Sequence, residues 1–185
     1  MAARSGMANL ILRWRRMVND GGTAIWDNDE AQQILDGHRR DVWRERLATV
    51  TVEEDGSTVY KTYTSKFDNL EETTGGTAVF RVYDSGGTAI GTANYTPDYE
   101  RGVIQFSADQ AGSAYYLDAR AYDLNAAAAD GWLERMANVS GYYDFSSDGQ
   151  SFKRSDYFAH CQAMAAYYRG KAPMTVSLLE RNDLA

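Results

Sequence analysis

The chain has 185 residues, 44% of them apolar and 24% charged, a composition that excludes wholesale disorder and supplies enough large side chains for a core. The net charge of −7 argues against a nucleic-acid duplex as the main partner, because neutralising phosphates requires clustered Lys and Arg. No segment approaches the roughly 18 consecutive apolar residues of a membrane helix, and the single cysteine, Cys161, excludes an intramolecular disulfide. We therefore expect a soluble, unexported protein of one or two small domains whose main partner is another protein.

Two amphipathic helices are predicted before residue 46. The apolar side chains of the first recur at helical spacing: Met7, Leu10, Ile11, Trp14 and Met17. Its arginines fall on the opposite, solvated side: Arg13, Arg15 and Arg16. The second helix begins at a capping-box variant formed by Asp27 and Glu30, and its apolar stripe continues to His38 and Val42. Gly37 lies within that stripe and costs about 1 kcal/mol relative to Ala, so an earlier end at Gly37 stays open.

Between residues 46 and 121 the apolar pattern changes from helical spacing to alternation, and about six short strands are predicted. Turns are expected at three places: Asp55-Gly56, Gly86-Gly87 and Gly102. Residues 49–121 hold five basic and eleven acidic residues, so the acidity of the chain is concentrated here. The spacing of strands and turns favours an antiparallel sandwich or barrel.

Helical spacing returns after residue 122. One helix begins at an N-cap supplied by Asp123 or Asn125, contains a run of four alanines and ends at Gly141. A loop then leads into a last helix, which Gly170 and Pro173 end. The apolar stripe of that last helix comprises Phe158, Cys161, Ala165 and Tyr168.

These patterns predict an α+β protein. Residues 1–45 and 122–171 are expected to form a small bundle of about four helices, and residues 46–121 an inserted antiparallel β domain. Residues 172–185 form a tail with no periodic partner in the chain. Because the tail alternates polar and apolar residues, as a strand added to a partner's sheet would, we expect it to be extended or mobile in the free subunit.

A search for catalytic chemistry finds no glycine fingerprint for dinucleotides, no phosphate loop, no zinc-protease motif and no serine nucleophile motif. His38 and His160 each stand alone on a predicted helix, so we expect no metal, no cofactor and no enzymatic activity. The acidic pairs Glu53-Glu54 and Glu71-Glu72 are interpreted as solvated charges on loops and strand edges. Several tyrosines of the β segment leave open an aromatic platform for carbohydrate: Tyr60, Tyr63, Tyr83, Tyr95, Tyr99, Tyr115 and Tyr116.

Three segments, residues 27–35, 122–137 and 148–168, resemble the neck adaptor proteins, or head-to-tail connectors, of tailed bacteriophages. The order of elements is similar as well: a short helix, an acid-started helix, a β insertion found in some members, an alanine-rich helix, a loop and a closing helix. The loop positions that carry the resemblance are Asp148, Gly149, Ser151, Phe152, Arg154 and Ser155.

The resemblance implies a ring of identical subunits, typically twelve, docked under the portal protein in the virion neck after assembly in the host cytoplasm. Such a ring extends the channel for the passing DNA without sequence-specific binding, and it offers a surface to the next neck or tail protein. Residues expected to pack subunits together are Ala127, Ala128, Trp132, Met136, Phe158 and Tyr168. Residues expected to bind the portal protein are Pro173, Met174, Val176, Leu178, Leu179 and Arg181.

Two alternative functions stay open. The β segment would serve as a binding module if the chain were a carbohydrate-binding or capsid-decorating sandwich supported by its helices. The chain could also occupy a neighbouring place in the neck, as a stopper or tail-completion protein, which differs only in the surface that meets the portal protein.

Overall fold

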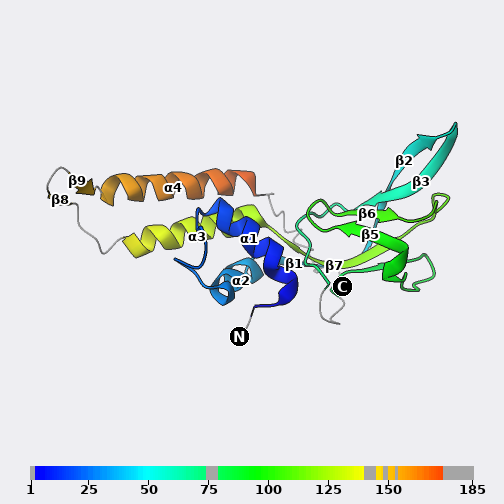
Figure 1. Cartoon of the computed structure of the whole chain (residues 1–185), viewed down its shortest axis with the longest axis horizontal. Coiled ribbons are helices and arrows are strands. Elements are labelled where there is room, and N and C mark those ends of the chain that lie inside the picture. The colour runs from blue at the N-terminus through cyan, green and yellow to red at the C-terminus, as the bar shows by residue number, and fades with distance from the viewer. Residues whose placement is uncertain (1–2, 74–78, 140–144, 148–149, 153, 173–185) are drawn as a thin grey trace, which may run out of the picture.

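The computed structural model describes residues 3–73, 79–139, 145–147, 150–152 and 154–172. Within them the chain has four α-helices, a three-stranded and a four-stranded antiparallel sheet, and a short two-stranded hairpin, which confirms the predicted α+β class. The helices gather at one end of an elongated molecule and the two larger sheets at the other (Figure 1). Neither sheet closes on itself.

The helices begin where the sequence places their caps. At Asp27 a full capping box forms, because its carboxylate accepts a bond from the backbone N–H of Glu30 at 2.8 Å and the Glu30 carboxylate accepts one from the N–H of Asp27 at 2.8 Å. Asp123, rather than Asn125, caps the alanine-rich helix by accepting from the N–H of Ala126 at 2.9 Å. The helices are α1 (Ala8–Met17, preceded by the 3-10 turn Ser5–Met7), α2 (Asn28–Asp36), α3 (Leu124–Val139) and α4 (Arg154–Lys171).

The second helix ends earlier than its apolar stripe suggests. α2 stops at Asp36 with Gly37 as its C-cap, so the earlier end that Gly37 left open is confirmed. Strand β1 (Arg39–Arg46) begins three residues after Asp36, and the helix does not follow the apolar stripe to His38 and Val42. Val42 is buried in the core of the sheets instead. The physical reason is a distant partner: β1 pairs antiparallel with a strand at residues 116–122, and no local pattern reveals that pairing.

The two larger sheets have simple antiparallel orders. The three-stranded sheet has the order β1-β7-β4, and the four-stranded sheet has the order β2-β3-β6-β5. Their remaining strands are β2 (Ala48–Glu54), β3 (Ser57–Thr64), β4 (Arg81–Tyr83), β5 (Tyr95–Asp98), β6 (Val103–Phe106) and β7 (Tyr116–Tyr122).

Two of the predicted turns depend on residues that accept a positive φ. Asp55 and Gly56 have φ of 51° and 75°, the backbone of the tight hairpin turn that joins β2 to β3. Gly102, with φ of 65°, joins β5 to β6, and a Cβ at this position would stand 2.0 Å from the carbonyl oxygen of Phe67. Only glycine fits there, so both predicted turns are confirmed.

The segment between α3 and α4 was predicted as a loop, and that prediction is wrong in part. It contains a short hairpin of β8 (Phe145–Ser147) and β9 (Gln150–Phe152), paired antiparallel. Strands of three residues are too short to show an alternating pattern, which explains why the sequence did not reveal them.

The molecule has two hydrophobic clusters that meet along β7. Leu117, Ala119 and Ala121 point into the cluster between the sheets, whereas Tyr122 belongs to the cluster of the helices. The predicted alternation of this strand is thereby confirmed. The helical cluster is built around Met7, Trp14, Val18, Leu35, Ala127, Ala128 and Trp132.

Candidate functional site

The helices are tied to the sheets by a group of charged and polar side chains that we call the joint: Arg4, Asp36, Glu71, Arg120 and Tyr122. The guanidinium of Arg4 bonds the Asp36 carboxylate at 2.6 Å and the Glu71 carboxylate at 2.9 Å. The hydroxyl of Tyr122 donates to Glu71 at 2.7 Å and accepts from Arg4 at 2.9 Å. Arg120 lies 3.5 Å from Glu71. Residues from both ends of the molecule therefore share one network.

The joint contradicts one interpretation of the sequence. Glu71 was expected to be a solvated charge, but it is 1% exposed. Its neighbour Glu72 is half-buried. A buried carboxylate is tolerated because charged partners and hydrogen bonds replace the water it loses. Its partners Arg4 and Tyr122 are 67 and 51 residues away in the sequence, so no motif identifies them in advance.

The environment of the joint shifts the pKa of two groups. Burial raises the pKa of Tyr122, and the bond that its hydroxyl donates to Glu71 raises it further. Burial also acts to raise the pKa of Asp36, but the hydrogen bond and charge of Arg4 outweigh it and lower that pKa below its ordinary value. Asp36 is thus held ionised and Tyr122 neutral, as an ion-pair network that holds the fold together requires.

A second correction concerns Arg15, which was predicted to lie on a solvated side of the first helix. It is 6% exposed, and its guanidinium binds the Asp20 carboxylate and the carbonyl oxygens of Gly22 and Trp26. Arg15 therefore organises the loop between α1 and α2. Arg16 is exposed, as predicted.

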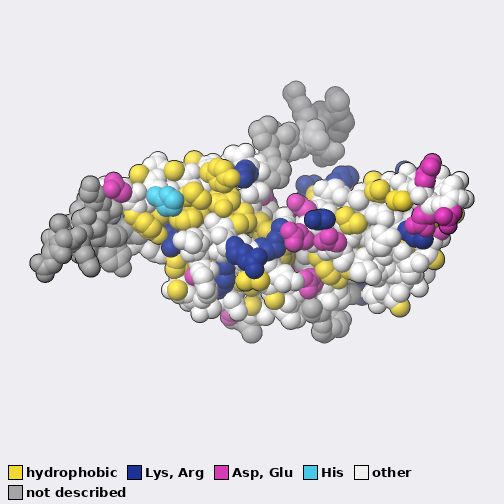
Figure 2. All heavy atoms as spheres, turned by 45° about the horizontal axis from the view of Figure 1, so that its top comes forward, with side chains coloured by type: hydrophobic (Ala, Val, Ile, Leu, Met, Phe, Trp, Pro, Cys, Tyr) yellow, Lys and Arg dark blue, Asp and Glu magenta, His cyan; other side chains and the backbone are white. Residues whose placement is uncertain are grey.

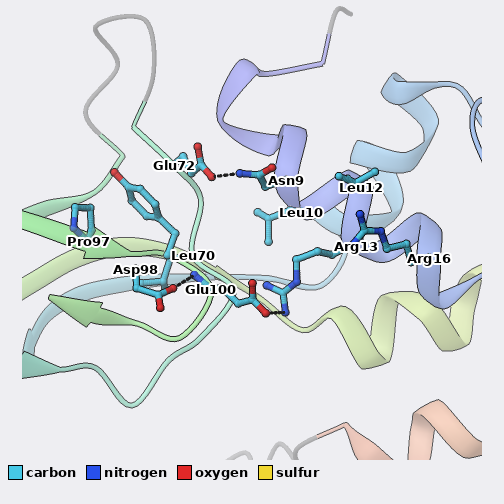
Figure 3. Close-up of a pocket in the computed structure, with 11 residues that line it drawn as sticks. Asn9, Leu10, Leu12, Arg13, Arg16, Leu70, Glu72, Pro97, Asp98 and Glu100 are labelled. Atoms are coloured by element: carbon cyan, nitrogen blue, oxygen red, sulfur yellow. Dashed lines mark hydrogen bonds and ion pairs between the residues drawn. The ribbon is translucent and has the colours of Figure 1, made fainter.

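A groove of about 510 Å³ runs between α1 and the turn from β5 to β6 (Figure 3). Arg13 reaches across it to Glu100, with 3.3 Å between guanidinium and carboxylate, and Asn9 donates to Glu72 (Figure 3). Leu12, on the same side of α1, has 48% of its surface exposed. The groove thus combines an exposed apolar side chain with three charges that already have partners, Arg13, Glu72 and Glu100, which suits contact with a protein segment better than acid–base chemistry.

The third feature is the helical hairpin of α3 and α4. α4 packs along α3, which is its one extensive contact among the described elements, and buries Cys161 and Ala165 there. The outward side of α4 carries small and aromatic side chains that are exposed: Ala159, Ala163, Ala166 and Tyr167. Figure 2 shows apolar side chains spread over the helical end of the molecule. Sequence reasoning missed this outward face because it followed only the buried stripe.

The residues predicted to pack subunits together lie mostly inside the chain. Ala127 and Ala128 are 0% exposed and Trp132 is 3% exposed, all in the helical core. Met136 and Tyr168 are partly buried against that core, and Phe158 is half-buried on α4. Three of the six are therefore enclosed by their own chain, and the exposed side of α4 is a different set.

Most of the other predicted site residues fall outside the described part of the chain. Of the loop positions, Arg154 and Ser155 lie in the first turn of α4, whereas Asp148 and Gly149 are not described. All the tail residues expected to bind the portal protein also lie outside the described residues: Pro173, Met174, Val176, Leu178, Leu179 and Arg181. The assignment of the tail to the portal protein stays a prediction.

None of the tyrosines that left a carbohydrate platform open is fully exposed; four are half-buried: Tyr60, Tyr83, Tyr99 and Tyr116. Tyr63, Tyr95 and Tyr115 are buried and pack around Phe106, with ring centroids 4.7 to 6.0 Å from it. Burial raises the pKa of each of the three hydroxyls. Their faces therefore serve the core between the sheets.

Within the described residues, no group of three or more His, Cys, Asp or Glu side chains is placed to hold a metal ion. The two histidines have separate partners: His38 lies 2.8 Å from the Asp130 carboxylate, and His160 stacks edge-on against Trp132. No helix in the described part of the chain combines the length and the hydropathy of a membrane span. No protein-family model matches this chain, and no curated protein matches it.

Proposed function

We propose that this chain is a structural protein of a tailed-bacteriophage virion: a head-to-tail adaptor that forms a ring under the portal protein and extends the DNA channel. The observation that carries the proposal is the α3–α4 hairpin. Among the described elements, α4 has an extensive contact with α3 alone, and it turns an exposed side of small and aromatic residues outward. A helix held in this way gains most of its remaining burial from a partner.

The sequence of the same hairpin supports the proposal from another direction. The segments 122–137 and 148–168, which resemble the neck adaptors, overlap α3, α4 and the short strand β9 that precedes α4. The resemblance and the exposed surface therefore fall on the same part of the molecule. The proposal assigns the chain no catalytic role and no cofactor.

The proposal includes the arrangement that the resemblance implies. The ring is expected to contain twelve copies, with the portal protein on one side and a downstream neck or tail protein on the other. DNA passes through it without sequence-specific binding, and the protein resides in the virion neck after assembly in the host cytoplasm. The two larger sheets are proposed to form a sandwich or barrel beside the ring of helices.

The portal contact is tested by truncation of the tail. Removing residues 174–185 is expected to abolish docking on the portal protein of the same phage while the melting temperature of the free protein changes little. A matched truncation of residues 183–185 alone keeps Leu178 and Leu179 and should dock normally. Binding is measured by cosedimentation with portal rings. Undiminished docking of the longer truncation would show that the tail is not the anchor.

The place in the virion is tested separately by locating the chain in electron cryomicroscopy images of the neck. Density for a ring of this protein directly beneath the portal protein supports an adaptor. Density further down the neck favours a stopper or tail-completion protein, and density on the capsid surface or binding on a glycan array favours the binding-module alternative.

A further inference from the structure

One part of the sheets projects from the rest of the molecule: the hairpin of β2 and β3, residues 48–64, which we call the arm (Figure 1). All seven residues of β2 are exposed. β3 pairs with β6 only from Thr62 to Thr64, so the outer half of the arm is a ribbon of two strands. Such a ribbon is at best marginally stable in water without a covering layer.

The arm presents an unpaired edge and an acidic tip. β2 is the last strand of its sheet, and in the described part of the chain it pairs only with β3. Val50 and Val52 have 40% and 48% of their surface exposed. The tip carries Glu53, Glu54 and Asp55. Among the described residues only Lys61 forms an ion pair with this tip, at 2.8 Å from Glu54. Figure 2 shows acidic side chains gathered at this end of the molecule.

The strand before the arm has the opposite character. β1 is the edge of the three-stranded sheet, and its exposed residues include Arg39, Arg40 and Arg46. Of its two acids, Glu45 is buried and accepts bonds from Ser65 and Lys66. Asp41 is exposed and lies 3.2 Å from Arg39, so one exposed acid stands against three exposed arginines. The exposed charge of β1 is therefore mainly positive, on a chain that is acidic as a whole.

Trp43 stands in the middle of this basic strand with 78% of its surface exposed, the highest value of any large apolar side chain described. The pairing of β1 with β7 shifts between Val42 and Glu45, and Arg44 there has a φ of 48°. The guanidinium of Arg44 lies 3.5 Å from the centre of the Tyr83 ring. The bulge thus holds Trp43 outward, and an exposed tryptophan flanked by arginines has the composition of an interface hot spot.

We propose that the arm of one copy of this chain docks on β1 of a neighbouring copy. The acidic tip faces the arginines of β1, and Val50 and Val52 cover Trp43. An arm does not reach its own β1, because Leu47 alone separates the two strands and a connection of one residue is too short to turn β2 back onto β1. The contact joins two different surfaces, so each copy uses both. Such head-to-tail contacts form a ring when the rotation between copies closes, and an open filament when it does not.

We identify the docked partner as a second copy because one chain carries two surfaces of opposite charge. An acidic projection and a basic edge with an exposed aromatic anchor are each other's match, and opposite charges across an interface select both partner and register. The inference depends on the proposed function, since it names the contact between subunits of the proposed ring. Its test uses self-association, whereas the proposed function is tested by portal docking and by position in the virion.

The experiment measures self-association of the full chain by sedimentation velocity. The double variants Glu53→Lys/Glu54→Lys in the arm and Arg39→Glu/Arg46→Glu in β1 are each expected to weaken association at least tenfold. When the two are mixed in equal amounts, association should return to the unmodified level, because every contact between unlike chains again joins opposite charges. Trp43→Ala should weaken association to a similar degree without lowering the melting temperature.

A matched control reverses an exposed arginine on the opposite edge of the same sheet: Arg81→Glu, in β4, should associate like the unmodified chain. Three results would overturn the inference: an unmodified chain that stays monomeric at every concentration, double variants that associate normally, or a mixture that fails to recover. If the chain docks on the portal protein but its arm variants associate normally, the proposed function stands and the contact between the arm and β1 is rejected.

Discussion

The joint and the arm both depend on acidic side chains, but they place them in opposite surroundings. At the joint, Glu71 is 1% exposed and bonded to Arg4 and Tyr122. In the arm, Glu53 and Glu54 lie on a strand that is exposed along its whole length. In the sequence both sites are two adjacent glutamates, Glu71-Glu72 and Glu53-Glu54. The difference is that Glu71 has Arg4, Arg120 and Tyr122 as partners in place of water, whereas Glu53 and Glu54 are solvated.

This difference separates stability from association. A buried charge that loses one partner keeps its desolvation cost, so changes at the joint should lower the free energy of unfolding strongly. An exposed charge is solvated before and after a substitution, so changes in the arm should leave stability nearly unchanged. Residues of the arm and of the outer side of α4 can therefore change to suit a partner with little cost to the stability of the fold.

The largest expected effect on stability comes from replacing the buried Trp14, and the exposed Trp43 is its comparison. Trp14→Ala should lower the free energy of unfolding by about 3 to 5 kcal/mol, because it leaves a cavity in the helical core. Trp14 is 0% exposed and stands edge-on to Trp26, with ring centroids 5.0 Å apart. Trp43→Ala, at 78% exposure, should stay within about 0.5 kcal/mol. Urea denaturation measures both free energies of unfolding. Similar losses for the two variants would contradict the separation of a stabilising core from a surface for association.

The next effect compares the acidic pairs directly. Glu71→Ala should cost about 3 kcal/mol, since Arg4 and Arg120 lose a shared buried carboxylate. Glu54→Ala removes only the exposed pair with Lys61 and should cost less than about 1 kcal/mol. The same denaturation experiment decides between them. If the two variants were equally stable, the joint would not be a stabilising network.

A smaller effect is expected from two helical glycines. A Cβ on Gly131 would stand 2.8 Å from the Trp14 ring and 2.9 Å from Val18, so Gly131→Ala should cost about 1 to 3 kcal/mol through overpacking of α3 against α1. Gly170 on α4 has nothing within 4 Å of that position, and Gly170→Ala should instead stabilise by up to about 1 kcal/mol. Melting temperatures should therefore move in opposite directions. A rise for both would mean that α1 and α3 can separate without cost.

The smallest effect depends on pH. The pKa of Asp36 is lowered below its ordinary value of 3.8, so its contribution to stability is complete above pH 3.8 and is lost as the pH falls through the lower, folded value. Arg4, Arg39 and Tyr122 face this carboxylate. Asp36→Asn should cost about 1 kcal/mol at pH 7, and the difference from the unmodified chain should shrink below pH 3.8.

Urea denaturation of both chains between pH 7 and pH 3 measures this difference. A gap that stays constant over the range would show that the charge of Asp36 contributes nothing and that only its hydrogen bonds matter. The Gly170→Ala variant is the control, because it removes no titratable group and its difference from the unmodified chain should stay constant over the same range.

Local sequence was sufficient for the features whose causes lie within a few residues. The capping box at Asp27, the tight turn at Asp55-Gly56 and the alternation of β7 were all predicted, since each depends on neighbours one to four positions away. The helices α1, α3 and α4 follow from the same short-range periodicity.

Tertiary structure alone decided where distant segments meet. Residues 39–46 became a strand because β7, some 80 residues later, offers an edge to pair with, and this overrode the helical stripe that ran through Val42. Arg15 and Glu71 became buried because their partners come from loops and segments that no periodic pattern connects to them. Burial of a charge is a property of the whole assembly of partners, so it emerges only once the chain has folded around it.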